Sequence, residues 1–278
     1  MKRHHLIIDV EKCENCNNCF LACKDEHVGN VWPGYAAPQK DQGQGWMTVY
    51  AKERGQYPLI DVAYLPVPCM HCDDAPCVRA GKGAVTKRAD GAVLIDPISG
   101  KGRKDLPATC PYGSIQWNEE LELPQKCTLC AHLLDKGWTK PRCVQSCPTG
   151  ALTFVNLEDR DMDRMVAEEK LEAYKPGTGA RPTVYYKNLY RYTHCFIAGS
   201  VATTVDGKEE CAEGVTVTLF NGSNERVAAA KTDCFGDFTF DRLPARSGRY
   251  TVSIVHRSAE ATVFAELGDS VNIGVIRI

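Results

Sequence analysis

The last third of the chain alternates between apolar and polar positions with a period of two. The alternation recurs in runs separated by short turns that contain Gly or Asp: Val215, Val217 and Leu219; Phe238 and Phe240; Tyr250, Val252 and Ile254; Val271, Ile273 and Val275. Successive side chains of a strand point to opposite faces, so this pattern predicts strands with one buried face. We therefore expect a small antiparallel β-sandwich of about seven strands over residues 196–278.

A helical period precedes the sandwich. Four apolar residues recur at near-helical spacing in a charged background between residues 158 and 172: Met162, Met165, Val166 and Leu171. The segment Lys175–Gly179 contains Pro and Gly, which end a helix. We expect residues 156–195 to be a connector with helical and extended parts, and a domain boundary near Cys195.

The first half of the chain is dominated by cysteine. Of 15 cysteines in 278 residues, twelve fall before residue 148, in these groups: Cys13, Cys16, Cys19 and Cys23; Cys69, Cys72 and Cys77; Cys110; Cys127, Cys130, Cys143 and Cys147. A chain of this length can be stable without a disulfide scaffold, so the concentration indicates metal or redox chemistry. The other three, Cys195, Cys211 and Cys234, have no metal-ligand spacing and are expected to be core or turn thiols.

The spacing C-x2-C-x2-C-x3-C from Cys13 to Cys23 is typical of a [4Fe-4S] site, in which the fourth cysteine binds a second cluster. Structural zinc is the alternative, but zinc sites usually combine two C-x2-C pairs across a longer spacer. Disulfides are disfavoured because neighbouring members of the run lie too close to pair well, and because no secretion signal is recognisable.

An internal duplication is visible after Cys110 and Cys147. Each is followed by Pro, then by Gly, then by a short apolar strand, at residues 115–117 and 151–154. We expect Leu6–Val10 and Ala92–Asp96 to be the hairpin partners of these strands. The prediction is an α+β chain in which residues 1–155 form a duplicated ferredoxin-like domain, with an inner unit at about 60–120.

As a set, these residues resemble the iron-sulfur subunits of dimethyl-sulfoxide-reductase-type molybdopterin oxidoreductases, over about residues 4–190. The likeness rests on Ile7–Cys13, Pro68–Cys77, Val93–Asp96 and Lys126–Cys130. In that family the cysteine motifs pair first with last and second with third. The resemblance therefore implies these ligands: Cys13, Cys16, Cys19 and Cys147 for cluster 1; Cys23, Cys127, Cys130 and Cys143 for cluster 2; Cys69, Cys72, Cys77 and Cys110 for cluster 3.

A fourth cluster of the family pattern has no cysteines here. Its expected positions hold Gly100, Arg103 and Leu106, with Gly81 at the position of the fourth ligand. All the missing ligands belong to one cluster, so we expect three [4Fe-4S] clusters. His71 and His132 lie beside cluster ligands and are expected to be neighbours that do not bind iron.

The resemblance also implies a partner. The catalytic molybdenum and its molybdopterin would reside on a large subunit, in a heterodimer or a multiple of one, and no catalytic residue is assigned to this chain. The combination of three clusters with an appended sandwich is similar to the branch that transfers a hydroxyl group between polyhydroxybenzenes in anaerobes. The alternatives are an electron-transfer subunit of another cytoplasmic molybdopterin reductase, and structural clusters with the sandwich as a docking module.

Two segments have weaker signals. Residues 24–68 form an insertion with Trp32, Trp46 and Tyr50, for which a packed surface excursion and an interface with the large subunit stay open. The sandwich resembles the transthyretin-like, carboxypeptidase-regulatory-like domains through residues 197–201, 214–217, 232–240 and 248–250.

Charge and hydropathy narrow the possible partners. The formal net charge of -2 argues against binding nucleic acid. We find no run of about 18 apolar residues that would insert in a membrane, and no export signal or twin-arginine pair near Met1. A cytoplasmic protein is expected.

Overall fold

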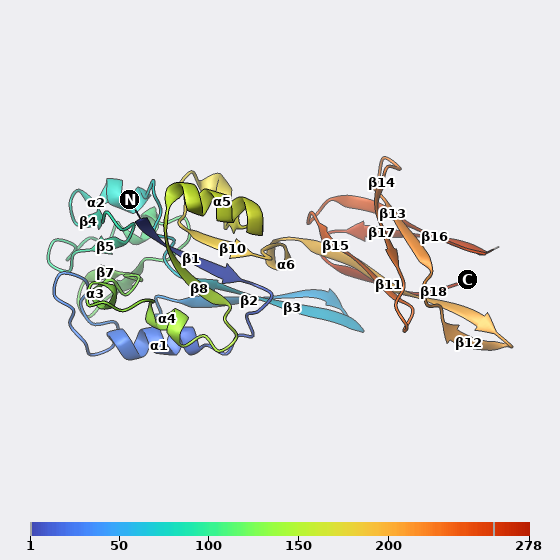
Figure 1. Ribbon diagram of the computed structural model, residues 1–278, viewed down its shortest axis with the longest axis horizontal. Coiled ribbons are helices and arrows are strands. Elements are labelled where there is room, and N and C mark those ends of the chain that lie inside the picture. Colours follow the sequence, from blue (N-terminus) through green and yellow to red (C-terminus); the bar gives the residue numbers. More distant parts are fainter. Residues whose placement is uncertain (1, 258) are drawn as a thin grey trace. The chain divides into compact units, whose positions relative to one another are not determined.

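The computed structural model describes residues 2–257 and 259–278 (Figure 1). The chain divides into two compact units. Unit 1 comprises Met1–Ala51 and Tyr64–Leu189, and unit 2 comprises Lys52–Ala63 and Tyr190–Ile278. Unit 2 therefore begins before residue 196 and includes a segment of the insertion. Among the described residues, no helix is both long enough and apolar enough to span a membrane.

Unit 1 is built on a four-stranded sheet in the order β8-β1-β10-β9. Its strands are β1 (Lys2–Asp9), β8 (Leu152–Glu158), β9 (Glu172–Ala173) and β10 (Val184–Lys187). β1 pairs antiparallel with β8, which confirms the first expected hairpin, and parallel with β10. The segment expected to be a connector thus supplies two strands of this sheet.

The helix expected between residues 158 and 172 is present as α5 (Asp159–Glu169). Figure 1 shows α5 beside the strands of this sheet. Its apolar stripe faces the sheet, where Met162 packs with Ile7 and Leu171 in one buried cluster. Asp159 and Asp161 occupy its first turn, where negative charge favours the helix dipole.

The second expected hairpin is wrong. Residues 92–96 do not pair with residues 115–117; each instead pairs with a nearer segment. The pairs are β4 (Val85–Lys87) with β5 (Val93–Ile95), and β6 (Gln116–Asn118) with β7 (Leu123–Gln125). Short loops are entropically easier to close, and local side chains hold both: Asp90 accepts from the Ala92 N–H, and Asn118 from the Leu121 N–H.

Short helices carry or adjoin the cysteines of unit 1. They are α1 (Asn18–His27), α2 (Pro76–Gly81), α3 (Ala131–Leu134) and α4 (Arg142–Gln145), with 3-10 turns η1 (Pro107–Thr109) and η2 (Pro176–Thr178). α2 begins with Pro76 at its first position, where the missing N–H has no helical partner to lose. Four cysteines lie within these helices: Cys19 and Cys23 in α1, Cys77 in α2 and Cys143 in α4.

Unit 2 is a two-sheet β-sandwich preceded by α6 (Tyr190–Thr193). Its strands are β11 (Cys195–Val205), β12 (Lys208–Cys211), β13 (Thr216–Phe220), β14 (Arg226–Lys231), β15 (Asp237–Leu243), β16 (Gly248–His256), β17 (Ala259–Leu267) and β18 (Val271–Arg277). One sheet has the order β12-β11-β15 with β18 beside β11, and the other β14-β13-β16-β17. The alternating residues of both sheets form one core around Val217, Phe240 and Val252.

Two details of the sandwich differ from expectation. The described residues form eight strands where about seven were expected, and β11 pairs parallel with β18, so the sandwich is not wholly antiparallel. The strand β12, with sequence KEEC, is exposed throughout and has no apolar face, so no alternation could reveal it.

A long hairpin, β2 (Thr48–Gln56) and β3 (Leu59–Val67), accounts for part of the insertion. Its tip belongs to unit 2. There Arg54 is fully buried, forms ion pairs with Asp61 at 3.2 Å and Asp241 at 2.5 Å, and places its guanidinium 5.1 Å from the centre of the Phe196 ring. This part of the insertion is therefore packed against the sandwich.

Candidate metal centres

Three cavities of unit 1 are each lined by four cysteines. Site 1 has Cys13, Cys16, Cys19 and Cys147; site 2 has Cys23, Cys127, Cys130 and Cys143; site 3 has Cys69, Cys72, Cys77 and Cys110. The structure thus brings the twelve cysteines together in the sets that the family resemblance implies.

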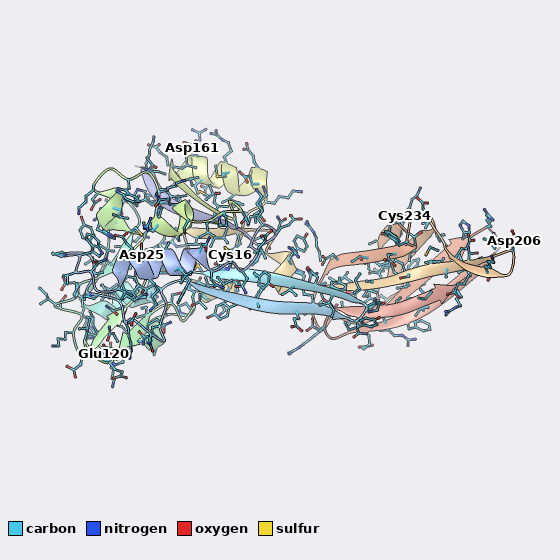
Figure 2. The ribbon with its side chains drawn as sticks, turned by 90° about the horizontal axis from the view of Figure 1, so that it is seen from below. Cys16, Asp25, Glu120, Asp161, Asp206 and Cys234 are labelled. Atoms are coloured by element: carbon cyan, nitrogen blue, oxygen red, sulfur yellow. The ribbon has the colours of Figure 1, made fainter. Side chains whose placement is uncertain are left out.

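The loop before α1 forms site 1. Asn15 and Asn17 have φ angles of 54° and 59°, a left-handed conformation that Asn tolerates better than most residues. These turns let the chain curl so that successive cysteines face one cavity. Cys16, in the loop before α1, is exposed (Figure 2). Cys19, in the first turn of α1, is buried.

Two short helices and α1 form site 2. Cys130 caps α3 in a left-handed conformation, and Cys143 lies within α4. The Leu129 N–H donates to the Cys127 sulfur at 3.3 Å. His27 and Trp46 line the same cavity, so two residues of the insertion contribute to this site.

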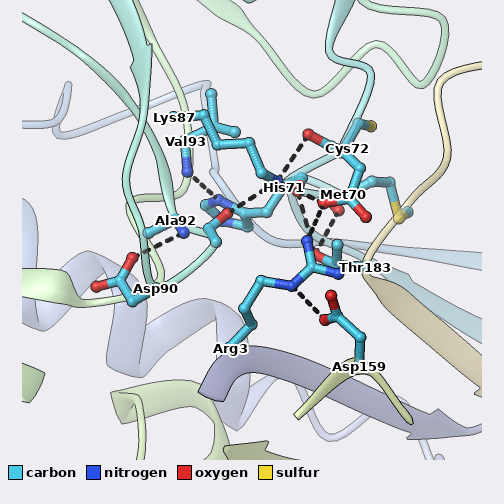
Figure 3. A network of polar contacts seen from close by, with 12 residues as sticks. Arg3, Met70, His71, Cys72, Lys87, Asp90, Ala92, Val93, Asp159 and Thr183 are labelled. Carbon is cyan, nitrogen blue, oxygen red and sulfur yellow. Dashed lines mark hydrogen bonds and ion pairs between the residues drawn. The ribbon is translucent and has the colours of Figure 1, made fainter. Parts of the chain in front are cut away.

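Site 3 is held by a dense polar network (Figure 3). The His71 N–H donates to the Cys69 sulfur at 3.4 Å, and its imidazole Nδ1 accepts from the Val93 N–H at 2.9 Å. The Thr183 hydroxyl donates to the His71 carbonyl at 3.1 Å. On the other side of the cavity, the Ser114 N–H donates to the Cys110 sulfur at 3.4 Å. These bonds fix the loop that carries Cys69 and Cys72.

Each of the three sites contains buried thiols that are harder to ionise than an ordinary cysteine. Burial raises the pKa of Cys19 and Cys127 to about 11 and that of Cys72 and Cys130 to about 12, and nearby thiols add to the effect. Coordination to a cationic centre reverses this, because a metal-bound thiol is deprotonated. Sets of four cysteines around a cavity match the ligands of a [4Fe-4S] cluster.

The sites adjoin one another. The thiol of Cys19 interacts electrostatically with Cys23 and Cys143, which joins site 1 to site 2. Cys127 interacts in the same way with Cys69, which joins site 2 to site 3. Site 2 therefore neighbours both of the others.

The positions of the fourth family cluster are filled by protein. Arg103 donates to the carbonyl oxygens of Ala80 at 2.8 Å and Gly81 at 3.0 Å, at the end of α2. Leu106 is fully buried. A Cβ added at Gly100 would lie 2.6 Å from the Asp96 carbonyl oxygen, and one at Gly81 would lie 2.8 Å from Val85. Two of the four expected ligand positions, Arg103 and Gly81, are therefore in contact. However, neither Gly81 nor Gly100 has room for a side chain.

The three remaining cysteines lie in unit 2. Cys195 is buried and donates to Asp269 at 3.4 Å, whereas Cys211 is exposed. Cys234 is also exposed (Figure 2). Within residues 2–257 and 259–278, no three His, Cys, Asp or Glu side chains form a group that could hold a single metal ion.

Sequence reasoning missed several neighbours of the cavities. Lys126 lines site 3, although it was noted only as part of a motif. Trp32 stacks on His132 with ring centres 4.2 Å apart, and the His132 Nε2 lies 2.9 Å from the Glu26 carboxylate. The sequence did show two tryptophans in the insertion, Trp32 and Trp46. Their spacing, however, did not indicate that they lie near site 2.

Two family models of known proteins match parts of this chain. Residues 60–157 match the family model described as 4Fe-4S dicluster domain, and residues 194–264 match "BOS complex subunit NOMO1-like, second beta sandwich domain". The pyrogallol hydroxytransferase small subunit of Pelobacter acidigallici is 45% identical, and the alignment covers 100% of both chains.

Other relatives match only part of the chain. A subunit of the sulfite dehydrogenase of Allochromatium vinosum is 32% identical over 65% of this chain and 81% of its own length. A component of the anaerobic dimethyl sulfoxide reductase of Escherichia coli is 32% identical over 56% of this chain and 75% of its own length. The protein belongs to the iron-sulfur subunits of the dimethyl-sulfoxide-reductase-type molybdopterin oxidoreductases, and it is similar over its full length to the pyrogallol hydroxytransferase small subunit.

Proposed function

We propose that this chain is the small subunit of an enzyme that transfers a hydroxyl group between pyrogallol and phloroglucinol, and that it carries three [4Fe-4S] clusters. The observation that carries the proposal is the 45% identity over 100% of the chain, because it includes the sandwich. The two partial relatives, by contrast, align with 65% and 56% of the chain.

The twelve cysteines would hold the clusters in the sets that line sites 1, 2 and 3. Iron-sulfur clusters supply one-electron redox capacity at potentials set by burial, hydrogen bonds and charge. The chain's own contribution is to exclude water around sites 2 and 3 and to present site 1, with its exposed Cys16, toward a partner. The partner is a large subunit with molybdopterin and molybdenum, in a cytoplasmic heterodimer or a multiple of one.

The test is to co-express the chain with its molybdopterin-binding large subunit and to purify the complex without oxygen. We expect about twelve iron and twelve sulfide per small subunit, molybdenum in the complex, and conversion of pyrogallol to phloroglucinol. Zinc in place of iron, or a complex that converts no polyhydroxybenzene, would contradict the proposal.

A second function is an electron-transfer subunit of another molybdopterin reductase, which the names of the partial relatives favour. Hydroxyl transfer between polyhydroxybenzenes involves no net oxidation. In the second function, the clusters would be reduced and reoxidised in each turnover, so the reduced fraction of the iron-sulfur signal would change. The reaction would then require an external electron donor or acceptor. Iron-sulfur spectra recorded during steady-state turnover separate the two.

A further inference from the structure

Lys126 is a buried cation beside two of the cysteine cavities. It is only 3% exposed. Its ammonium donates to the carbonyl oxygens of Val93 and Cys127, the latter at 3.1 Å. In the part of the chain that the structure describes, no carboxylate forms an ion pair with it. Two carbonyl dipoles alone compensate a buried charge poorly, so this lysine requires an anion nearby.

The cysteine thiolates are the available anions. Lys126 lines site 3 together with Cys77, and it hydrogen-bonds the backbone of Cys127, a member of site 2. Its positive charge counteracts the rise in the pKa of both thiols that burial causes. The thiolates of Cys127 and Cys69 would repel each other between these two sites, and a cation placed there weakens that repulsion.

We propose that Lys126 supplies the countercharge for the clusters of sites 2 and 3 and thereby raises their reduction potentials. Reduction adds negative charge to a cluster, and a nearby fixed cation favours the more negative state. The inference rests on the proposed occupancy of these sites by [4Fe-4S] clusters. It assigns Lys126 an electrostatic role that neither the family match nor the cysteine pattern specifies.

Lys87 provides a matched control. Its ammonium also lies beside site 3, where it donates to the carbonyl oxygens of His71 and Cys72 at 2.9 Å each (Figure 3). Unlike Lys126, it forms an ion pair with a carboxylate, that of Asp73 at 2.9 Å. The Asp73 charge largely cancels that of Lys87 at the distance of the cluster, so removing Lys87 should have a smaller effect.

The experiment compares Lys126→Met, Lys126→Arg and Lys87→Met in the purified complex. Iron and sulfide are measured first, and the clusters are then titrated by electron paramagnetic resonance at controlled potential. In Lys126→Met we expect the reduced-to-oxidised ratio of at least one cluster at fixed potential to fall about tenfold, which corresponds to about 59 mV for one electron. Lys126→Arg and Lys87→Met should change it less than about threefold.

Each outcome bears on the proposal. Full iron with unchanged potentials in Lys126→Met overturns it, and so does an equal fall in Lys126→Arg. Should Lys126→Met itself lose iron, the arginine variant decides. If Lys126→Arg keeps its iron and its potentials, the site requires a positive charge, which supports the proposal. If both variants lose iron, Lys126 has a packing role and the proposal is overturned. A wild-type complex without iron would contradict the proposed function itself, and the iron measurement reveals this before any potential is compared.

Discussion

At the scale of residues, backbone N–H groups hold several cysteine sulfurs in place. The donors are His71 to Cys69, Ser114 to Cys110 and Leu129 to Cys127. His71 and Leu129 have φ angles of 44° and 58°, in a region that is unfavourable for side chains other than Gly, Asn and Asp. Their surroundings must therefore stabilise this conformation, which directs the N–H toward the sulfur.

The assignment of thiols to sites makes a first prediction. Replacing Cys110 with Ser should remove about four of about twelve irons, and the loss should be confined to site 3, because Cys110 lines that cavity. Replacing Cys23 should instead affect site 2. Iron analysis together with the spectrum of each cluster measures both effects.

Cys234→Ser is the control, because this exposed thiol belongs to unit 2 and should leave all the iron bound. Loss of the site 1 signal in the Cys23 variant would show that the sets are paired wrongly.

Single residues also show how far sequence reasoning reaches. The grouping of cysteines followed from spacing and family resemblance, because ligands recur in fixed patterns. Lys126 and His27 could not be assigned to a cavity in this way. A single lysine or histidine has no period, and its neighbours come from segments distant in sequence.

At the scale of elements, alternation predicted most strands of the sandwich but not all the partners of strands. The pairing of β1 with β8 was predicted from the duplicated Cys-Pro pattern. The same reasoning failed for β5 and β6, because short turns at Asp90 and Asn118 offered nearer partners. Strand pairing depends on loop closure and side-chain contacts that a repeat in sequence does not reveal.

The hairpin tip in unit 2 gives a second prediction. Arg54→Met removes a buried guanidinium that binds Asp61 and Asp241, which should cost about 2 kcal/mol. Amides of β11 and β15 should then exchange with deuterium about thirtyfold faster, while the iron content is unchanged.

The matched control is Arg277→Met, which breaks an exposed ion pair with Glu209 at 2.6 Å. Exposed pairs contribute little, so exchange in this variant should change by no more than about threefold. Equal exchange in the two variants would mean that the buried arginine does not secure the tip.

At the scale of the whole molecule, the twelve cysteines of the three sites all belong to unit 1. The third prediction is that a chain ending at Leu189 still binds about twelve irons, since unit 2 supplies none of the cysteines that line the sites. Binding of the large subunit should weaken, because the sandwich contributes surface. Iron content and co-purification of the large subunit are measured on the same preparation.

If the shortened chain keeps its iron and binds the large subunit as tightly as the full chain does, the sandwich has no docking role. Loss of about four irons would place a ligand in unit 2 and contradict the assignment of all three sites to unit 1.

The packing around Gly81, Gly100, Arg103 and Leu106 determines what a change to cysteine at these positions would do. A single cysteine at any of the four positions would gain no cluster, because three further ligands would still be missing. At Gly100 and Gly81 the new side chain would also collide with its neighbours. A cysteine at either glycine would therefore destabilise the chain without forming a cluster, so a fourth cluster would require changes at all four positions together.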